Sequence, residues 1–243
     1  MTASATIPAF GFLEWTHLVF TRLSHRFEHG DAEGQLAWAI ETFGGGLSVG
    51  TSFGASGIML MDLALRLQPD IDIFYIDTGF FFPETHVLID RLQQHYQRSF
   101  RRVTAQLSVT EQATEVGPAL YRHNPDLCCH LRKVAPLEIA LADSTAWATA
   151  IRRDQAATRR QTPSISWNER YNVAKLAPLA AVREEEVWHY IHTHRLPYNE
   201  LHDRSYPSIG CWPCTRPVQP GEDPRAGRWQ GFAKVECGLH LAR

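Results

Sequence analysis

Five cysteines carry the clearest chemical signal in this chain, and four of them occur in two close pairs. Cys211 and Cys214 form a C-x-x-C pair within the stretch Tyr206–Arg216, and Cys128 is followed directly by Cys129. In a cytosolic protein, paired thiols are more often metal ligands or redox groups than disulfides. We therefore expect these four cysteines to hold a metal centre rather than to be buried free thiols.

The spacing of the cysteines within each pair distinguishes between a zinc site and an iron–sulfur cluster. Structural zinc usually binds two separated C-x-x-C knuckles, and the directly adjacent Cys128 and Cys129 have poor geometry for a knuckle. An iron–sulfur cluster offers several irons, so neighbouring thiolates can bind different ones. The spacing therefore favours a [4Fe–4S] cluster held by Cys128, Cys129, Cys211 and Cys214, and zinc stays the alternative.

The fifth cysteine, Cys237, lies near the C-terminus beside Gly238 and His240. A free thiol with a pKa of about 8.5 is only slightly ionised at neutral pH, yet it is already nucleophilic. Nearby arginines would raise the ionised fraction. On the residues alone, Cys237 is either an inert surface cysteine or a nucleophile.

Two loops lie where an α/β sheet is expected to bind a ligand. The loop Ser52–Gly57 joins an expected strand to an expected helix, and its free N–H groups and the helix dipole would favour an anion such as phosphate. It lacks the G-K-[ST] of a P-loop, and a plain tight turn is the alternative. The loop Asp77-Thr78-Gly79 ends the next strand at the same edge of the sheet. Together the two loops predict a nucleotide site.

Basic residues gather after another expected strand and near the C-terminus. Arg152 and Arg153 follow the strand directly, with Arg159 and Arg160 a few residues on. Arginine suits bidentate binding of phosphate or sulfate better than lysine does. With Arg225 and Arg228 in the tail, the set indicates an anion site, although a solvated basic face is the simpler interpretation of each one alone.

Hydrophobic periodicity and turn residues predict alternating strands and helices. We expect strands over 47–51, 71–76, 100–103 and 146–151, and helices over 31–43, 58–67, 83–96, 133–142 and 183–194. This alternation predicts a mainly parallel, twisted α/β sheet with helices on both faces. We expect one domain over residues 1–243, with an irregular packed extension over 1–30 and a mobile tail over 217–243.

Composition excludes several classes of protein. The 243 residues are 44% hydrophobic and 21% charged with a net charge of −2, which is typical of a globular domain and gives no global signal for nucleic-acid binding. No apolar run reaches the length of roughly 18 residues that spans a membrane, and no export signal is apparent. We therefore expect a cytoplasmic protein without nucleic-acid or membrane partners. The sequence leaves open whether it forms a homo-oligomer.

Several motifs occur in a fixed order from about residue 47 to the C-terminus. They are Asp77-Thr78-Gly79 with Phe82–Thr85, then Cys128–Lys133, Ile151–Gln155, Tyr206–Arg216 and Glu236–His240. In this combination they closely resemble the assimilatory adenylylsulfate and phosphoadenylylsulfate reductases. The resemblance implies an adenine nucleotide alpha hydrolase-like fold and reduction of an activated sulfate to sulfite, with thioredoxin or a glutaredoxin-like protein as the reductant.

The resemblance also assigns roles to residues. Cys237 would attack the sulfur, release AMP and become an S-sulfocysteine, from which a thioredoxin thiol would release sulfite. Independently of the resemblance, we expect His240, three residues further on, to tune this thiolate. Arg160 is the alternative to Arg159 at one of the arginine positions. The residues expected at the substrate are Ser52, Phe53, Gly54, Asp77, Thr78, Gly79, Lys133, Arg153, Arg159, Arg225, Arg228 and His240.

Both cysteine pairs are present, so the chain resembles the iron–sulfur adenylylsulfate (APS) enzymes more than those that use 3′-phosphoadenylylsulfate (PAPS). APS is the expected substrate, and PAPS, alone or in addition, is the alternative. Ser56 and Gly57 depart from the family, where acidic residues usually follow Ala55. Two other classes are less favoured: an ATP pyrophosphatase such as a tRNA-thiolating enzyme, whose loop pattern this chain lacks, and a non-catalytic zinc module.

Overall fold

The centre of the molecule is a six-stranded sheet. In the computed structural model, which describes residues 17–28 and 30–240, the strand order is β3-β2-β1-β4-β6-β5. All neighbouring pairs are parallel except β5 and β6, which are antiparallel. The strands are β1 (Leu47–Gly50), β2 (Asp72–Asp77), β3 (Arg101–Thr104), β4 (Ala146–Thr149), β5 (Ile165–Asn168) and β6 (Val173–Leu176). The mainly parallel α/β sheet expected from the sequence is thus confirmed.

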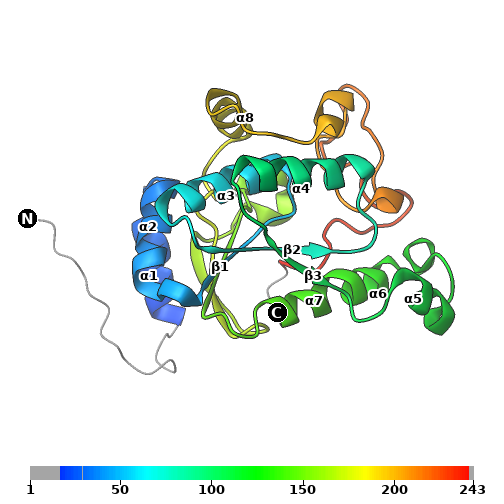
Figure 1. Ribbon diagram of the computed structural model, residues 1–243, viewed down its shortest axis with the longest axis horizontal. Helices are drawn as coiled ribbons and strands as arrows, with labels where there is room; N and C mark the ends of the chain where they lie inside the picture. Colours follow the sequence, from blue (N-terminus) through cyan, green and yellow to red (C-terminus); the bar gives the residue numbers. More distant parts are fainter. Residues whose placement is uncertain (1–16, 29, 241–243) are drawn as a thin grey trace, which may run out of the picture.

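Helices cover both faces of this sheet (Figure 1). On one side, α3 packs on β1, and α2 and α8 pack on α3; on the other side, α7 packs on β2 and β3. Figure 1 also shows α4 beside α3, and α5 and α6 beyond α7. The bounds are α2 (Ala32–Phe43), α3 (Ala55–Leu67), α4 (Pro83–His95), α5 (Val109–Val116), α6 (Pro125–Cys129), α7 (Ala135–Ala140) and α8 (Glu184–Thr193).

Local chemistry explains where these helices begin. The Asp31 side chain accepts a hydrogen bond from the Gly34 N–H at the start of α2, and Pro83 occupies the first turn of α4, where its missing N–H costs nothing. Helix α3 is buried over Ser56–Leu65 and forms the centre of the hydrophobic core. Within the described part of the chain, no helix has both the length and the apolar character needed to span a bilayer.

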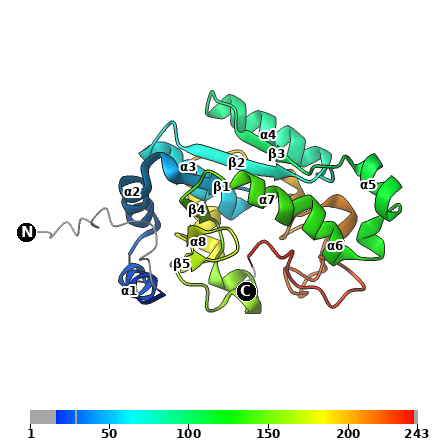
Figure 2. The ribbon, with the colours of Figure 1, turned by 90° about the horizontal axis from the view of Figure 1, so that it is seen from below.

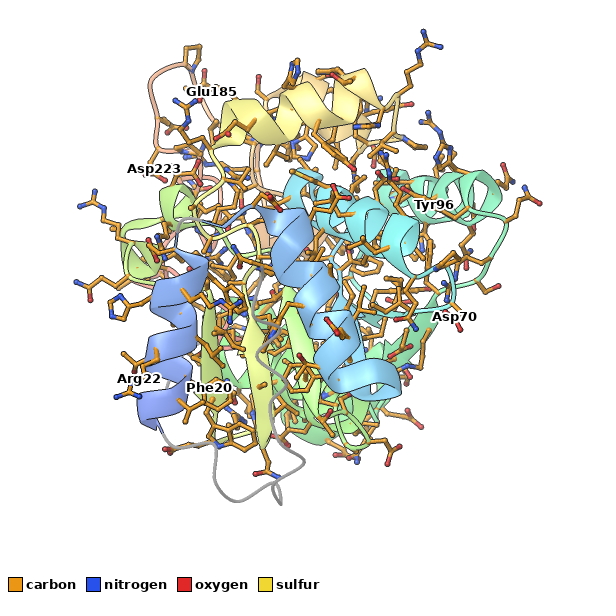
Figure 3. The ribbon with its side chains drawn as sticks, turned by 90° about the vertical axis from the view of Figure 1, so that its left-hand side faces the viewer. Phe20, Arg22, Asp70, Tyr96, Glu185 and Asp223 are labelled. Carbon is orange, nitrogen blue, oxygen red and sulfur yellow. The ribbon has the colours of Figure 1, made fainter. Side chains whose placement is uncertain are left out.

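The expected irregular extension over residues 1–30 is wrong where the structure describes it. Residues His17–Phe27 form helix α1, which packs on the edge strand β5. Phe20 and Phe27 are buried, and Figure 3 shows Phe20 directed inward while Arg22 points away from the sheet. The antiparallel strand β5, its neighbour β6 and helix α5 were not predicted either. Residues 1–16 lie outside the described residues.

The carboxyl ends of β1 and β4 meet at the point where the strand order reverses. Strands β2 and β3 continue from β1 in one direction, and β4, β6 and β5 continue in the other. Open α/β sheets bind their ligands at such a switch point. The described part of the tail, residues 217–240, returns to this edge of the sheet, near α6 and α7 (Figure 2), and buries Trp229 and Glu236 there.

Candidate active site

A cavity of about 280 Å³ opens at this switch point. Its wall is formed by Ser52 after β1, by Arg152 after β4, and by Lys133 from the π-helical turn His130–Val134. The tail closes the cavity with Cys237. The topology therefore brings together four segments that are far apart in the sequence.

Unsatisfied polar atoms indicate that the cavity takes a polar ligand. Among the described residues, four buried side-chain nitrogens in its wall have no hydrogen-bond partner: Trp147 Nε1, His202 Nε2, Arg228 Nε and His240 Nδ1. Buried polar groups are nearly always paired. A ligand with several acceptor and donor atoms would provide the missing partners.

The loop after β1 offers its backbone to the cavity. Gly54 is the N-cap of α3 and has no side-chain cap hydrogen bond, so N–H groups of the first turn stay available. Ser52 is exposed at the cavity. Phe53 does not reach the cavity: its side chain is 1% exposed and packs against Tyr75 and Phe100. Phe53 was expected at the substrate, and the structure directs its side chain away from the cavity, because this side chain anchors the loop in the core.

The unusual residues Ser56 and Gly57 have structural reasons. The Ser56 hydroxyl is bonded to Arg152 and to Gln155 Nε2, so it ties the loop after β1 to the loop after β4. A Cβ at Gly57 would lie 2.8 Å from Thr51 Oγ1. The absence of acidic residues here thus permits close packing at the base of the cavity.

Of the loop Asp77-Thr78-Gly79, only Thr78 lines the cavity. Asp77 is buried and accepts hydrogen bonds from Gly79 N–H at 2.8 Å and from Arg102 at 2.9 Å. Gly79 has a φ of +72° and forms the turn itself. The prediction that Asp77 and Gly79 contact substrate is not supported, because both residues shape the turn that presents Thr78.

Arg153 was expected at the substrate, and the structure places it elsewhere. It pairs with Glu28 and donates to the carbonyl of Thr162, in a groove beside α1. Arg152 instead lines the cavity and is 4% exposed. The backbone of Arg152 is extended, and successive side chains of extended backbone point in opposite directions. Arg160 is exposed in the groove with Arg153, so Arg159 is the residue of that pair at the cavity.

Four further cations line the cavity, and their partners differ. Lys133 and Arg228 have no carboxylate within ion-pair distance among the described residues, whereas Arg159 and Arg225 both pair with Glu236. Burial lowers the pKa of Lys133, but negative charge on Cys211 and Cys237 outweighs this effect, and the pKa lies above its usual value. A positive charge on Lys133 is thus stabilised where the neighbouring cysteine sulfurs are ionised.

Arg228 is held in place from two sides. Its guanidinium lies 4.6 Å from the centre of the Trp229 ring, and Nη1 donates to Ser208 Oγ at 3.2 Å. Gly210 allows this position, since a Cβ there would lie 2.0 Å from Arg228 Nη2. The glycine that precedes Cys211 thus serves the anion site as well as the turn.

Cys237 and His240 both line the cavity, as expected. The His240 ring is stacked on Trp147 at 5.4 Å, and Lys175 Nζ lies 3.4 Å from the His240 carbonyl oxygen. Burial, together with the charges of Lys175 and Arg159, holds the pKa of His240 well below its usual value. The ring is neutral at physiological pH, so any influence on the Cys237 thiol would come from hydrogen bonding and not from charge.

The four paired cysteines come together at a second, small cavity next to the first, which we call the cysteine cavity. It is lined by Cys128, Cys129, Cys211 and Cys214. Lys133 and Trp229 line both cavities. Residues 128 and 129 end helix α6, while Cys211 precedes a short 3-10 turn and Cys214 ends it, so the fold unites two distant segments.

The thiol chemistry of this cavity fits a metal centre. Burial raises the pKa of Cys128 to about 12 and that of Cys214 to about 11, so both stay protonated unless a cation compensates the lost hydration. Within the described residues, no three His, Cys, Asp or Glu side chains are grouped to hold a single metal ion. A multi-iron cluster would bind four thiolates that are spread more widely.

Some residues of the cavity were missed by sequence reasoning. Trp147 lies inside a strand and His202 in a short 3-10 turn, so neither forms part of a recognisable motif. Glu236 lies in a motif but was given no role. The alternation of side chains in extended backbone was the signal that distinguishes Arg152 from Arg153.

Fold and cavity together define a nucleotide-binding α/β protein with a cysteine in a cationic site. The chain belongs to the phosphoadenosine phosphosulfate reductase domain family, whose profile matches residues 46–217. The family expected from the motifs is thus confirmed.

Individual relatives support this family membership. The chain is 47% identical to the adenosine 5'-phosphosulfate reductase of Staphylococcus haemolyticus, over 85% of this chain and 86% of that one. It is 44% identical to that of Salinibacter ruber, over 94% and 91%. The phosphate complex of phosphoadenylyl-sulfate reductase from Candida auris superposes with a TM-score of 0.75 at 30% identity, covering 85% of this chain and 100% of that one. A Candida glabrata FMN adenylyltransferase, with a TM-score of 0.55 and 13% identity, shares the fold alone.

Proposed function

We propose that this protein reduces adenylylsulfate to sulfite and AMP, with Cys237 as the nucleophile. The observation that carries the proposal is the position of Cys237 in a cavity whose cations Lys133 and Arg228 lack carboxylate partners among the described residues. The names of the relatives at 44% and 47% identity support APS as the substrate. The name of the Candida auris structure makes PAPS, alone or in addition, the second candidate.

The reaction proceeds through a covalent intermediate. The Cys237 thiolate attacks the sulfur of the phosphosulfate, the bond from sulfur to the bridging oxygen breaks, and AMP leaves with the electron pair. A thiol of the reductant then attacks Cys237 Sγ, so that sulfite leaves and a mixed disulfide forms. The second thiol of the reductant resolves this disulfide. The dithiol supplies the two electrons that convert sulfate to sulfite.

Electrostatics explain the need for the cations. Attack of a thiolate on a phosphosulfate brings anions together, and negative charge builds up on the leaving phosphate. Preorganised cations in a closed site stabilise such charge strongly, by roughly 10²–10³ in rate for each group. Lys133 and Arg228 are placed to do this, and free N–H groups of α3 can hold a phosphate.

The four thiols of the cysteine cavity would hold a [4Fe–4S] cluster. When bound, the cluster would supply negative charge that tunes the electrostatics of the substrate site. Lys133 lines both cavities, so it is the side chain on which this charge would act. Electron transfer through the cysteine cavity is not required, because Cys237 and the reductant account for both electrons.

The protein reductant would be thioredoxin or a glutaredoxin-like dithiol, and the reaction belongs to sulfate assimilation, toward cysteine, in the cytoplasm. Cys237 is partly exposed in the closed cavity, and the next residue, Gly238, has a φ of +88°. Movement of the tail about such a residue would present the S-sulfocysteine to the reductant.

One assay tests the proposal. Sulfite release is measured with APS and with PAPS in parallel, in the presence of thioredoxin and its reductase, for the wild type and Cys237→Ser. We expect release from APS by the wild type and none by the variant. Sulfite release by Cys237→Ser would refute the mechanism. Turnover of PAPS but not of APS would make PAPS the substrate in place of APS.

A separate measurement tests the cluster. The purified protein is expected to be brown and to contain iron and acid-labile sulfide in equal amounts. Cys128→Ser and Cys211→Ser should lose both elements, whereas Cys237→Ser should keep them. A colourless wild-type protein with stoichiometric zinc would overturn this assignment.

A further inference from the structure

Glu236, the residue before the proposed nucleophile, is engaged by two cavity arginines. Arg159 donates to it through both Nε and Nη2, each at 2.7 Å, and Arg225 Nη2 lies 3.3 Å from Oε2. The Thr158 hydroxyl donates to Oε1 at 3.1 Å. Burial raises the pKa of Glu236, but the hydrogen bonds and charges of Arg159 and Arg225 outweigh it, so the carboxyl is ionised.

This arrangement occupies one of the two bidentate edges of Arg159, the one formed by Nε and Nη2. The remaining terminal nitrogen, Nη1, donates to Gln155 Oε1 at 2.6 Å. While Glu236 is docked, three of the five N–H donors of Arg159 are therefore used within the protein. Lys133 and Arg228 have no such carboxylate partner among the described residues, so their charge is available.

We infer that Arg159 and Glu236 are a positioning pair that seats the tail in the cavity, while Lys133 and Arg228 stay available to hold substrate anions. This inference rests on the proposed function and deepens it. It divides the cations of one cavity into two roles. Arg159, with help from Arg225 and Thr158, fixes the residue next to Cys237 and thereby the position of its sulfur.

Burial makes the pair a strong determinant of tail position. The side chains of Arg159 and Glu236 are 14% and 7% exposed. Removal of one member leaves the other charge buried without its partner, which is costly in a low-dielectric site. The tail should then leave the cavity more often, because opening lets the remaining charge regain water.

The first experiment measures tail opening without any turnover. Cys237 is alkylated with N-ethylmaleimide, a neutral reagent that the cationic cavity does not attract, and its modification is followed by peptide mass spectrometry. Glu236→Gln should raise the rate at Cys237 at least ten-fold, and Thr158→Val should raise it by less. Glu222→Gln is the matched control: Glu222 forms a forked pair with Arg216 in the same tail, outside the cavity wall, and should leave the rate unchanged. A Glu236→Gln rate within two-fold of the wild type would overturn the inference.

The second experiment separates positioning from substrate binding. Sulfite release from APS is measured for Arg159→Gln, Glu236→Gln and the double variant, with Arg228→Gln as the comparison. A positioning pair predicts that both single variants lower kcat about equally with little change in KM, and that the double variant is no worse than either. Arg228→Gln should raise KM and add to Glu236→Gln.

An Arg159→Gln variant that raises KM as Arg228→Gln does, and whose effect adds to that of Glu236→Gln, would assign Arg159 to the substrate and refute the pair. If the wild type releases no sulfite from APS or PAPS, the proposed function fails, while the alkylation rates still decide whether Glu236 seats the tail.

Discussion

The two cysteine regions of this protein lie side by side and differ in what holds them. The cysteine cavity is part of an apolar cluster in which Cys128 and Cys211 pack with Phe80 and Leu120. Cys237 lies instead on a tail that is seated by ion pairs and a ring stack. The same side chain is thus buried among hydrocarbon in one region and placed among cations in the other.

This difference explains why cysteine is suited to metal binding in one region and to nucleophilic attack in the other. Apolar burial raises thiol pKa values and keeps thiols inert until a metal binds. A cationic surrounding favours the binding of an anionic substrate beside the sulfur. Lys133 and Trp229 form the wall between the regions.

Removal of one thiol from each region should lower stability in the cysteine cavity and leave it nearly unchanged in the tail. Cys128→Ser deletes a buried ligand of the proposed metal centre, and we expect the free energy of unfolding to fall by more than about 4 kcal/mol, as for loss of a metal. Cys237→Ser should change it by less than about 0.5 kcal/mol, because the sulfur belongs to no apolar cluster of the described residues. Denaturant unfolding under anaerobic conditions measures both. Equal losses of unfolding free energy in the two variants would contradict the difference between the two cysteine regions.

A methyl group at Gly210 should damage the substrate site and spare the metal site. The added Cβ would lie 2.0 Å from Arg228 Nη2, so the guanidinium must move. We expect KM for APS to rise about ten-fold, which corresponds to about 1.4 kcal/mol. Iron content should stay at the wild-type value, although Gly210 precedes Cys211. Loss of iron with unchanged KM would contradict this prediction.

Acid should loosen the tail before the cysteine cavity. The pKa of His240 in the closed tail lies well below its usual value, which is about 6.5 in an unfolded chain. Below that pH, an opened tail takes up a proton that the closed tail does not. The free energy of tail opening should therefore fall by at most about 1.4 kcal/mol for each pH unit below 6.5.

Hydrogen exchange of peptides from residues 217–240, corrected for the intrinsic pH dependence, measures this opening at pH 7.5 and 5.5. His240→Gln should abolish the difference, while peptides around Cys128 should show none in either protein. An equal pH response in the variant would exclude His240 as its cause.

The smallest effect is expected at the neighbouring arginines after β4. Arg153→Gln removes an ion pair with Glu28 away from the cavity, so kcat and KM should stay within two-fold and stability should fall by less than about 1 kcal/mol. Arg152→Gln breaks the tie to Ser56 in the cavity wall and should affect KM more. Kinetics with APS compare the two. A larger effect of Arg153→Gln would restore its predicted role at the substrate.

The sequence predicted the central fold well, because periodicity and turn residues are local. Strands β1 to β4 and helices α2, α3, α4 and α8 were located within a few residues. Helix α1 and strands β5 and β6 were missed, since α1 gains its stability from burying Phe20 and Phe27 against other elements and β5 pairs antiparallel at an edge. Tertiary packing decides such elements more than propensity does.

For the site, the sequence alone determined the candidates: two cysteine pairs, a lone cysteine and a set of arginines, in an order that resembles one family. Only the tertiary structure decided which of them meet. It placed Arg152 and not Arg153 at the cavity, directed the Phe53 side chain into the core, and paired Glu236 with Arg159. The physical reason is that side-chain direction and ion pairing depend on the elements that pack around a residue, and a motif does not encode them.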